Sequence, residues 1–219
     1  MSVQAVIFDM DGTLVDSMPF HMESWRLFFA NHKISLTKTE FDAIHHGTVF
    51  DIMPRLFGSH ISSQEAWTLG NEKESLYREL YRGKVVPTKG LPGLLQSLYE
   101  NNIPMAIGTA ADDLNAAFVM DELDIHHFFK AVVTSNQVPE GKPSPKVYLE
   151  TAKALAVNPA QCIVFEDTIS GIEAAKAAGM TVVGITTGLD ASVLLQHGAA
   201  MAIDNFTQID LQQIERFFV

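Results

Sequence analysis

The sequence has little of several residue types, and each shortage excludes a class of protein. One cysteine, Cys162, occurs in 219 residues, so no disulfide can form within the chain, and its apolar surroundings predict a buried thiol. Lysine and arginine number 15 against 26 acidic residues, and no basic cluster interrupts that excess. We therefore expect neither nucleic acid nor an anionic membrane surface as a partner.

Long apolar runs are also missing. No stretch approaches the uninterrupted length that a membrane-spanning helix needs. The chain begins MSVQAVIFDMDGT, which has no basic leader and turns acidic after a short apolar run, so we do not expect a signal peptide. A hydrophobic content of 47% with 19% charged residues is typical of a folded globular protein. We expect a cytoplasmic protein, and a monomer.

Short apolar runs alternate with helical patterns along most of the chain. The runs that have the length and the flanking turn residues of buried strands are VQAVIFD, IPMAIGT, AVVT, CIVFE, TVVGIT and AMAID. Helical segments lie between them, and the pair Ser144-Pro145 has the arrangement of a helix start. This alternation predicts an α/β fold with a doubly wound, Rossmann-like parallel sheet that helices cover on both faces.

One interval, from about residue 17 to residue 83, carries no strand pattern. Two segments inside it, Thr37–Glu40 and Ser62–Glu65, have the spacing of a capping box and predict two helix starts. We therefore expect an all-helical cap domain inserted after the first strand. The predicted domains are an α/β catalytic core of residues 1–15 and 86–219, and a helical cap of residues 16–85.

The residues that could carry chemistry stand at the ends of the expected strands. Ligands of a doubly wound sheet bind beyond the carboxyl ends of its strands. The first strand runs into Asp9 and Asp11, and Gly12 permits an immediate turn that lets both face one pocket. The later segments that reach the same edge contribute Thr109, Lys142, Glu166 and Asp167.

So many carboxylates at one edge predict a bound cation. Neighbouring carboxylates repel each other, and Mg²⁺ is a hard ion that prefers such oxygen ligands. One carboxylate could attack phosphorus while its neighbour handles the leaving-group proton, with Lys142 and Thr109 holding the transferring oxygens. Taken singly, Asp11-Gly12 could be only a turn, Thr109 a β-branched strand residue, and Lys142 a solvated loop lysine. Taken together, they predict Mg²⁺-dependent phosphoryl transfer.

The ordered set of motifs resembles a known family. DxDGT at a strand end, a strand-terminal threonine, Lys142-Pro143, and Glu166-Asp167 ahead of SGIEAA are similar to the haloacid dehalogenase superfamily. The pattern resembles most closely its β-phosphoglucomutase and sugar-phosphatase branch, and the likeness covers essentially the full chain. Dehalogenases proper lack the second aspartate of DxDGT and the need for a metal.

The resemblance implies a role for each matching position. Asp9 corresponds to a nucleophile that becomes an aspartyl-phosphate and also binds the metal. Asp11 corresponds to the general acid and base, with its backbone carbonyl on the metal. The remaining positions correspond to a third Mg²⁺ ligand at Asp167, a supporting or water-mediated ligand at Glu166, and a phosphate-binding pair at Thr109 and Lys142.

Positions in the cap are implied by the same resemblance. His21 matches a hinge histidine and Lys73 a lysine that reaches the substrate, although either could be an ordinary helix residue. In β-phosphoglucomutase an arginine shortly after the cap-loop glycine clamps a second phosphate. Here Gly47 is followed at that position by Phe50, which cannot bind phosphate through paired hydrogen bonds, and Arg55 lies about a helical turn later.

We therefore expect a phosphatase that acts on small phosphate esters such as sugar phosphates. A β-phosphoglucomutase-type isomerase is the first alternative, because it uses the same two aspartates and adds a grip on a second phosphate. An inorganic pyrophosphatase and a catalytically dead binding domain are further alternatives. The intact carboxylate set disfavours the dead domain.

Overall fold

The computed structural model describes residues 2–44, 48–138 and 140–218. The chain divides into two compact units, Met1–Asp16 with Val85–Val219, and Ser17–Lys84. Among the described residues, no helix has both the length and the apolar content needed to cross a bilayer.

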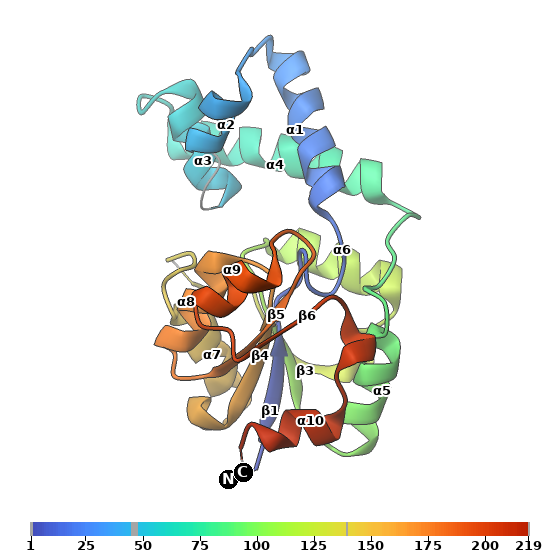
Figure 1. Cartoon of the computed structure of the whole chain (residues 1–219). Helices are drawn as coiled ribbons and strands as arrows, with labels where there is room; N and C mark the ends of the chain where they lie inside the picture. The colour runs from blue at the N-terminus through green and yellow to red at the C-terminus, as the bar shows by residue number, and fades with distance from the viewer. Residues whose placement is uncertain (1, 45–47, 139, 219) are drawn as a thin grey trace. The chain divides into compact units, whose positions relative to one another are not determined.

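The first unit is built around a parallel sheet of six strands in the order β3-β2-β1-β4-β5-β6 (Figure 1). The strands are β1 (Ala5–Phe8), β2 (Met105–Gly108), β3 (Phe129–Val133), β4 (Cys162–Glu166), β5 (Thr181–Ile185) and β6 (Met201–Ile203). The chain adds strands first on one side of β1 and then, from β4, on the other. The order therefore reverses between β1 and β4, and such a switch point is where ligands of these sheets bind.

Helices cover both faces of this sheet, which confirms the predicted fold class (Figure 1). Ala5 and Ile7 of β1 pack into the core beneath α7, α8 and α9. Phe8 stacks on Phe165 with ring centres 5.2 Å apart and meets Phe206 on the side of α5. The helices of this unit are α5 (Leu91–Glu100), α6 (Asp113–Leu123), α7 (Lys146–Ala154), α8 (Ile169–Ala177), α9 (Ala191–Gln196) and α10 (Leu211–Arg216), with 3₁₀ turns η1 (His126–Phe128), η2 (Pro159–Gln161) and η3 (Phe206–Gln208).

The second unit is helical throughout its described residues. Its elements are α1 (Met18–His32), α2 (Lys38–Ile44), α3 (Val49–Phe57) and α4 (Ser63–Tyr81). Trp25, Phe28 and Phe41 form an aromatic centre with edge-to-face contacts at about 5.7 Å. This unit therefore has a hydrophobic core of its own.

Capping boxes set the helix starts in this unit. The predicted boxes at Thr37 and Ser62 are both confirmed, with each side chain exchanging hydrogen bonds with the glutamate three residues on. A third box, Thr48 with Asp51, opens α3 and is not predicted, because aspartate replaces the usual glutamate or glutamine.

Two local expectations have different outcomes. Cys162 is buried as predicted, and burial raises the pKa of its thiol to about 11, so it is not reactive at neutral pH. The helix expected to open at Ser144-Pro145 begins one residue later than predicted. Pro145 occupies the N-cap position, and α7 starts at Lys146.

Candidate active site

Two carboxyl groups meet where β1 and β4 end. Asp9 directly follows β1, and Glu166 is the last residue of β4. The register pairs Phe8 with Phe165, so Asp9 stands opposite Glu166 at the switch point of the sheet. The backbone N–H of Asp9 donates to the Phe165 carbonyl at 2.9 Å and continues the strand pairing up to the site.

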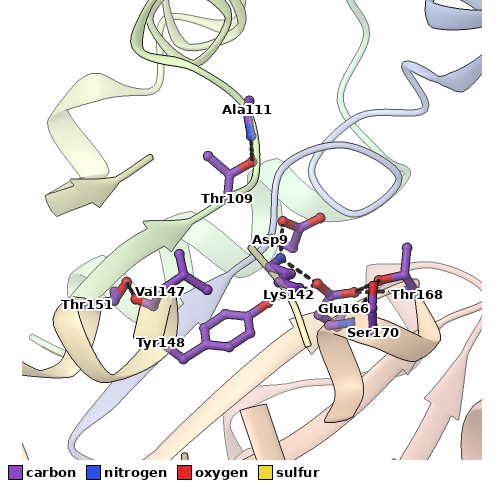
Figure 2. A network of polar contacts seen from close by, with 11 residues as sticks. Asp9, Thr109, Ala111, Lys142, Val147, Tyr148, Thr151, Glu166, Thr168 and Ser170 are labelled. Atoms are coloured by element: carbon purple, nitrogen blue, oxygen red, sulfur yellow. Dashed lines mark hydrogen bonds and ion pairs between the residues drawn. The ribbon is translucent and has the colours of Figure 1, made fainter. Parts of the chain in front are cut away.

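Lys142 joins these two carboxyl groups (Figure 2). Its Nζ lies 2.7 Å from Oδ1 of Asp9 and 2.6 Å from Oε1 of Glu166. The Lys142 side chain is only 7% exposed, so water and salt screen these ion pairs weakly. Burial acts to lower the pKa of Lys142, but the charges of Asp9 and Glu166 hold it well above its ordinary value. Lys142 is therefore not the solvated loop lysine that remained open from the sequence.

Glu166 is fully buried and receives hydrogen bonds on both oxygens. Oε1 accepts from Lys142 and from the Tyr148 hydroxyl at 2.9 Å. Oε2 accepts from the backbone N–H of Thr168 at 2.8 Å and from its hydroxyl at 3.0 Å. Burial acts to raise the pKa of Glu166, yet Lys142 and these hydrogen bonds hold it below its ordinary value. Gly171 leaves space for the Glu166 carboxylate, because a Cβ on Gly171 would collide with it. Glu166 is an ionised anchor for Lys142.

Asp167 lies beside this pair and has fewer partners. One oxygen each of Asp9, Glu166 and Asp167 lie within 4.8 Å of one another. Oδ1 of Asp167 is buried and has no hydrogen-bond partner in the part of the chain that the structure describes. Gly12, with φ of 81°, faces this carboxylate, and a Cβ on Gly12 would overlap it. The glycine of DxDGT therefore makes space for the Asp167 carboxylate as well as the turn.

The site holds more negative charge than its lysine offsets. Burial raises the pKa of Asp9 to about 7, helped by the charges of Glu166 and Asp11 and opposed by Lys142. Burial also raises the pKa of Asp167 to about 9, with Glu166 and Asp9 adding to the effect. Buried carboxyl groups in this situation either take up protons or bind a further cation.

The residues present fit a Mg²⁺ ion. The donor set consists of hard carboxylate oxygens, the acidic groups are close together, and the Oδ1 atom of Asp167 is buried without a partner among the described residues. Both oxygens of Glu166 already accept two hydrogen bonds each, so Asp9 and Asp167 are the better candidates for direct ligands.

Asp11 and Thr109 lie near this group. Asp11 is half-buried in the turn after β1, and its charge acts on the pKa of Asp9, so the two carboxyl groups are neighbours. The hydroxyl oxygen of Thr109 accepts from the backbone N–H of Ala111 at 3.1 Å (Figure 2). Among the described residues, the Thr109 hydroxyl proton has no acceptor, so it can donate to a ligand.

Sequence reasoning missed several residues whose hydrogen bonds support this site. Tyr148 and Thr168 bind Glu166, while the Thr187 hydroxyl donates to the Gly12 carbonyl at 2.6 Å and the Thr88 hydroxyl to the Thr13 carbonyl at 2.7 Å. The signal for Thr168 was its N-cap position before α8. Tyr148 carried a weaker signal, a polar aromatic residue on the buried face of the helix that follows Lys142. Nothing local marked Thr88 or Thr187.

The helical unit contains the remaining candidates, except that Gly47 lies outside the described residues. Lys73 of α4 is 2% exposed, which rules out the interpretation as a solvated helix residue. Its Nζ lies 2.8 Å from Nδ1 of His21 and 2.9 Å from Oε1 of Glu74. The His21 ring stacks on Tyr77 with centres 3.8 Å apart. His21 and Lys73 are thus brought together by α1 and α4.

Phe50 packs inside the same unit. Its ring lies against Gly70 of α4, where a Cβ would be 2.7 Å from the nearest ring carbon. It also lines a small cavity of about 300 Å³ together with Trp67. Arg55, the nearest guanidinium in sequence, donates to the Ile44 carbonyl at 3.1 Å and so contacts the end of α2.

Comparisons with known proteins agree with this geometry. The family model of the haloacid dehalogenase-like hydrolases matches residues 6–185. The chain belongs to the haloacid dehalogenase-like hydrolases. A fructose-1-phosphate phosphatase of Escherichia coli (strain K12) is 32% identical over 180 residues, which is 82% of this chain and 95% of that protein. A β-phosphoglucomutase of Bacillus subtilis (strain 168) is 31% identical over 205 residues, 85% of this chain and 84% of that protein.

Solved structures give the same result. The crystal structure of a haloacid dehalogenase hydrolase of family IA, variant 3, from Entamoeba histolytica has a TM-score of 0.86 and 32% identity, and covers 96% of this chain and 97% of its own. The resemblance seen in the motifs is therefore confirmed. As an enzyme of this family, the chain has relatives that are sugar phosphatases and relatives that are β-phosphoglucomutases.

Proposed function

We propose that this enzyme is a Mg²⁺-dependent phosphatase that acts on a small phosphate ester, such as a sugar phosphate, through an aspartyl-phosphate at Asp9. The observation that carries the proposal is the buried group of three carboxylates with one lysine at the switch point of the sheet. Haloacid dehalogenase-like relatives named as phosphatases of phosphorylated carbohydrates support the substrate class.

The metal would be held by Asp9 and Asp167, with Glu166 in a supporting position and the backbone carbonyl of Asp11 as the resemblance implies. When bound, Mg²⁺ supplies positive charge that offsets the carboxylates and the oxygens of a phosphoryl group. Oδ1 of Asp167, which has no hydrogen-bond partner among the described residues, is the atom in this set that most needs such a ligand.

The reaction steps use the chain's own side chains. The Asp9 carboxylate attacks phosphorus, and a bond from Asp9 oxygen to phosphorus forms as the bond to the leaving oxygen breaks. Asp11 donates a proton to that leaving oxygen. Lys142 and the Thr109 hydroxyl bind oxygens of the transferring group. In the second half, Asp11 takes a proton from water as the water oxygen bonds to phosphorus, and Asp9 is released.

Features of the cap favour hydrolysis over isomerisation. An isomerase must retain a bisphosphorylated intermediate, and a guanidinium clamp on the second phosphate is worth roughly 1.5–3 kcal/mol. By the resemblance Phe50 corresponds to the clamp position; it packs against Gly70, and Arg55 binds the Ile44 carbonyl. The isomerase remains the second candidate, because one relative is named a β-phosphoglucomutase. Cytoplasmic location and a monomeric state remain predictions.

A phosphate-release assay tests the proposal. A panel of sugar phosphates, other small phosphate esters and pyrophosphate is incubated with enzyme and Mg²⁺, with excess chelator as the matched control. We expect release of phosphate that stops in chelator. Asp9→Asn should abolish turnover, and Asp11→Asn should slow it by about a hundredfold or more. Turnover in excess chelator, or an Asp9→Asn enzyme near the wild-type rate, would rule the mechanism out.

A second assay separates the two outcomes. Enzyme, Mg²⁺ and β-glucose 1-phosphate are incubated with catalytic bisphosphate, and glucose 6-phosphate and free phosphate are measured in parallel. Hydrolysis releases one phosphate for each substrate consumed. Rapid formation of glucose 6-phosphate with little free phosphate identifies an isomerase instead, and release from pyrophosphate alone identifies a pyrophosphatase.

A further inference from the structure

Tyr148 lies behind the site and is fully buried in α7 (Figure 2). Its hydroxyl donates to Oε1 of Glu166 at 2.9 Å, the same oxygen that Lys142 contacts at 2.6 Å. The Nζ of Lys142 lies 4.9 Å from the centre of the Tyr148 ring. One side chain therefore touches both members of the Lys142–Glu166 ion pair.

The same ring also packs against the strand that leads to Thr109. A Cβ on Gly108 would lie 3.2 Å and 3.3 Å from two carbons of the Tyr148 ring, so the ring rests on the backbone at the end of β2. Tyr148 thus contacts residues from three different segments of the chain, which are Gly108, Lys142 and Glu166.

We propose that Tyr148 is a positioning residue for phosphoryl transfer, with its hydroxyl fixing Glu166 and its ring fixing Lys142. The inference rests on the proposed function, because it takes Lys142 as the group that binds the transferring phosphoryl oxygens. A lysine ammonium sits on a flexible four-carbon stem and has no preferred direction of its own. Glu166 on one side and the π-face of Tyr148 on another restrict that stem and keep Nζ within 2.7 Å of Asp9.

A purely structural role would not require this hydroxyl. Phenylalanine would fill nearly the same volume and contact the same ring neighbours. Instead, the buried hydroxyl donates to a carboxylate that lies one residue from Asp167 and that already has three other donors. The distinction is testable, because loss of positioning slows turnover by the folded enzyme, whereas loss of packing lowers only its stability.

The test compares Tyr148→Phe with Tyr99→Phe in the full chain. Tyr99 is 53% exposed on α5 and undergoes the same chemical change away from the site, so it is the matched control. The readouts are kcat and KM for the best substrate of the phosphate-release panel, with saturating Mg²⁺, together with the melting temperature. We expect Tyr148→Phe to lower kcat about tenfold with KM within about twofold, because the Lys142 charge remains but is misplaced. Tyr99→Phe should match the wild type.

The other outcomes of this test overturn either the positioning role alone or the proposed function together with it. A kcat for Tyr148→Phe within about twofold of the wild type, or a loss that follows the unfolded fraction, overturns the inference. Tyr148→Leu removes the ring as well and should lower kcat further, and if Tyr148→Phe is partly unfolded at the assay temperature, kcat of the wild type and of both variants is compared at a lower temperature at which Tyr148→Phe is folded. If the wild type neither releases phosphate from any ester nor forms glucose 6-phosphate from β-glucose 1-phosphate, phosphoryl transfer fails as the function and the positioning role fails with it. An active wild type with an unaffected Tyr148→Phe variant refutes only the positioning role.

Discussion

In the part of the chain that the structure describes, the side chains of Lys142 in the α/β unit and Lys73 in the helical unit are buried, and their surroundings differ. In the α/β unit, the Lys142 side chain is 7% exposed and contacts Asp9 and Glu166, with Asp167 beside them. In the helical unit, Lys73 is 2% exposed and contacts Glu74, with His21 as a second partner. Both lysines also lie near aromatic rings, Lys142 at 4.9 Å from Tyr148 and Lys73 at 5.2 Å from Trp25.

The difference lies in the charge balance. Lys73 and Glu74 form a buried ion pair in which one positive charge balances one negative charge. Lys142 faces three carboxyl groups, and burial together with their mutual repulsion raises the pKa of Asp9 and of Asp167. A balanced buried pair indicates a structural role, whereas an unbalanced cluster at a strand end indicates a site that completes itself with a ligand.

Lys142→Met should abolish most of the activity. The change keeps an unbranched side chain but removes the positive charge from three buried carboxyl groups. We expect kcat to fall by about 10²–10³-fold, the usual scale for loss of a group that stabilises transition-state charge. Phosphate release by the folded variant at saturating Mg²⁺ is the measurement, and activity within about tenfold of the wild type would contradict the assignment.

Lys73→Met should act on stability more than on turnover. It removes the ammonium that Glu74 contacts in a buried position, so the free energy of unfolding should fall by about 3 kcal/mol in denaturant titrations. The double variant Lys73→Met/Glu74→Gln should recover part of that loss, because both charges are then gone. A loss of kcat without a loss of stability would instead show that Lys73 reaches the substrate.

In chelator, the excess of carboxyl groups around Lys142 should make the melting temperature depend on pH. The pKa of Asp9 is raised to about 7 and that of Asp167 to about 9, so the unfolded chain releases these protons at lower pH than the folded chain. Their contribution to stability is therefore fully present below their ordinary pKa of 3.8, and it is lost as the pH rises from there through about 7 for Asp9 and about 9 for Asp167. The melting temperature in chelator should fall across this window.

Two controls sharpen that experiment. Mg²⁺ should raise the melting temperature most at the upper end of the window, because it binds the deprotonated carboxylates. Asp167→Asn should flatten the fall, because one of the titrating groups is gone. A melting temperature in chelator that rises with pH across the window would refute the charge imbalance.

The smallest expected effect concerns Thr13, which lies in the turn after β1, and Thr88, whose hydroxyl contacts that turn. The Thr13 hydroxyl is buried with no partner among the described residues, while the Thr88 hydroxyl donates to the Thr13 carbonyl at 2.7 Å. Thr13→Val should leave the free energy of unfolding unchanged or raise it by about 1 kcal/mol, and Thr88→Val should lower it by about 1 kcal/mol. Denaturant titration of both variants checks the opposite signs. A loss for Thr13→Val would show that its hydroxyl binds a buried water.

Much of the fold could be predicted because its signals are local. Each strand of the sheet is a short apolar run bounded by turn residues, and each predicted run overlaps a strand, although β3 begins at Phe129, before its predicted run AVVT. The capping boxes at Thr37 and Ser62 are visible as four-residue patterns. The box at Thr48 is harder to recognise because its last residue is an aspartate, and α7 starts one residue later than its pattern predicts. These errors are confined to element ends, where local signals are weakest.

The acidic residues of the candidate site could be predicted from the sequence, but their contacts could not. The rule that ligands bind beyond the carboxyl ends of parallel strands is enough to gather Asp9, Glu166 and Asp167 from the sequence. That rule cannot show that Lys142 pairs with Asp9, since these residues are 133 positions apart. It also cannot show that both oxygens of Glu166 already accept hydrogen bonds, which favours an anchoring role for this residue over direct binding of the metal.

Periodicity, turn residues and strand ends depend on near neighbours, so they are enough to predict the order of strands and helices along the chain, a helical insert, and a set of acids at one sheet edge. Near neighbours cannot show which lysine faces an excess of carboxylates and which is balanced. Lys73 meets His21 across 52 positions, and Tyr148 reaches Glu166 across 18. Burial and charge pairing depend on packing between distant segments, and this packing sets the pKa of Asp9 and holds Lys142 beside it.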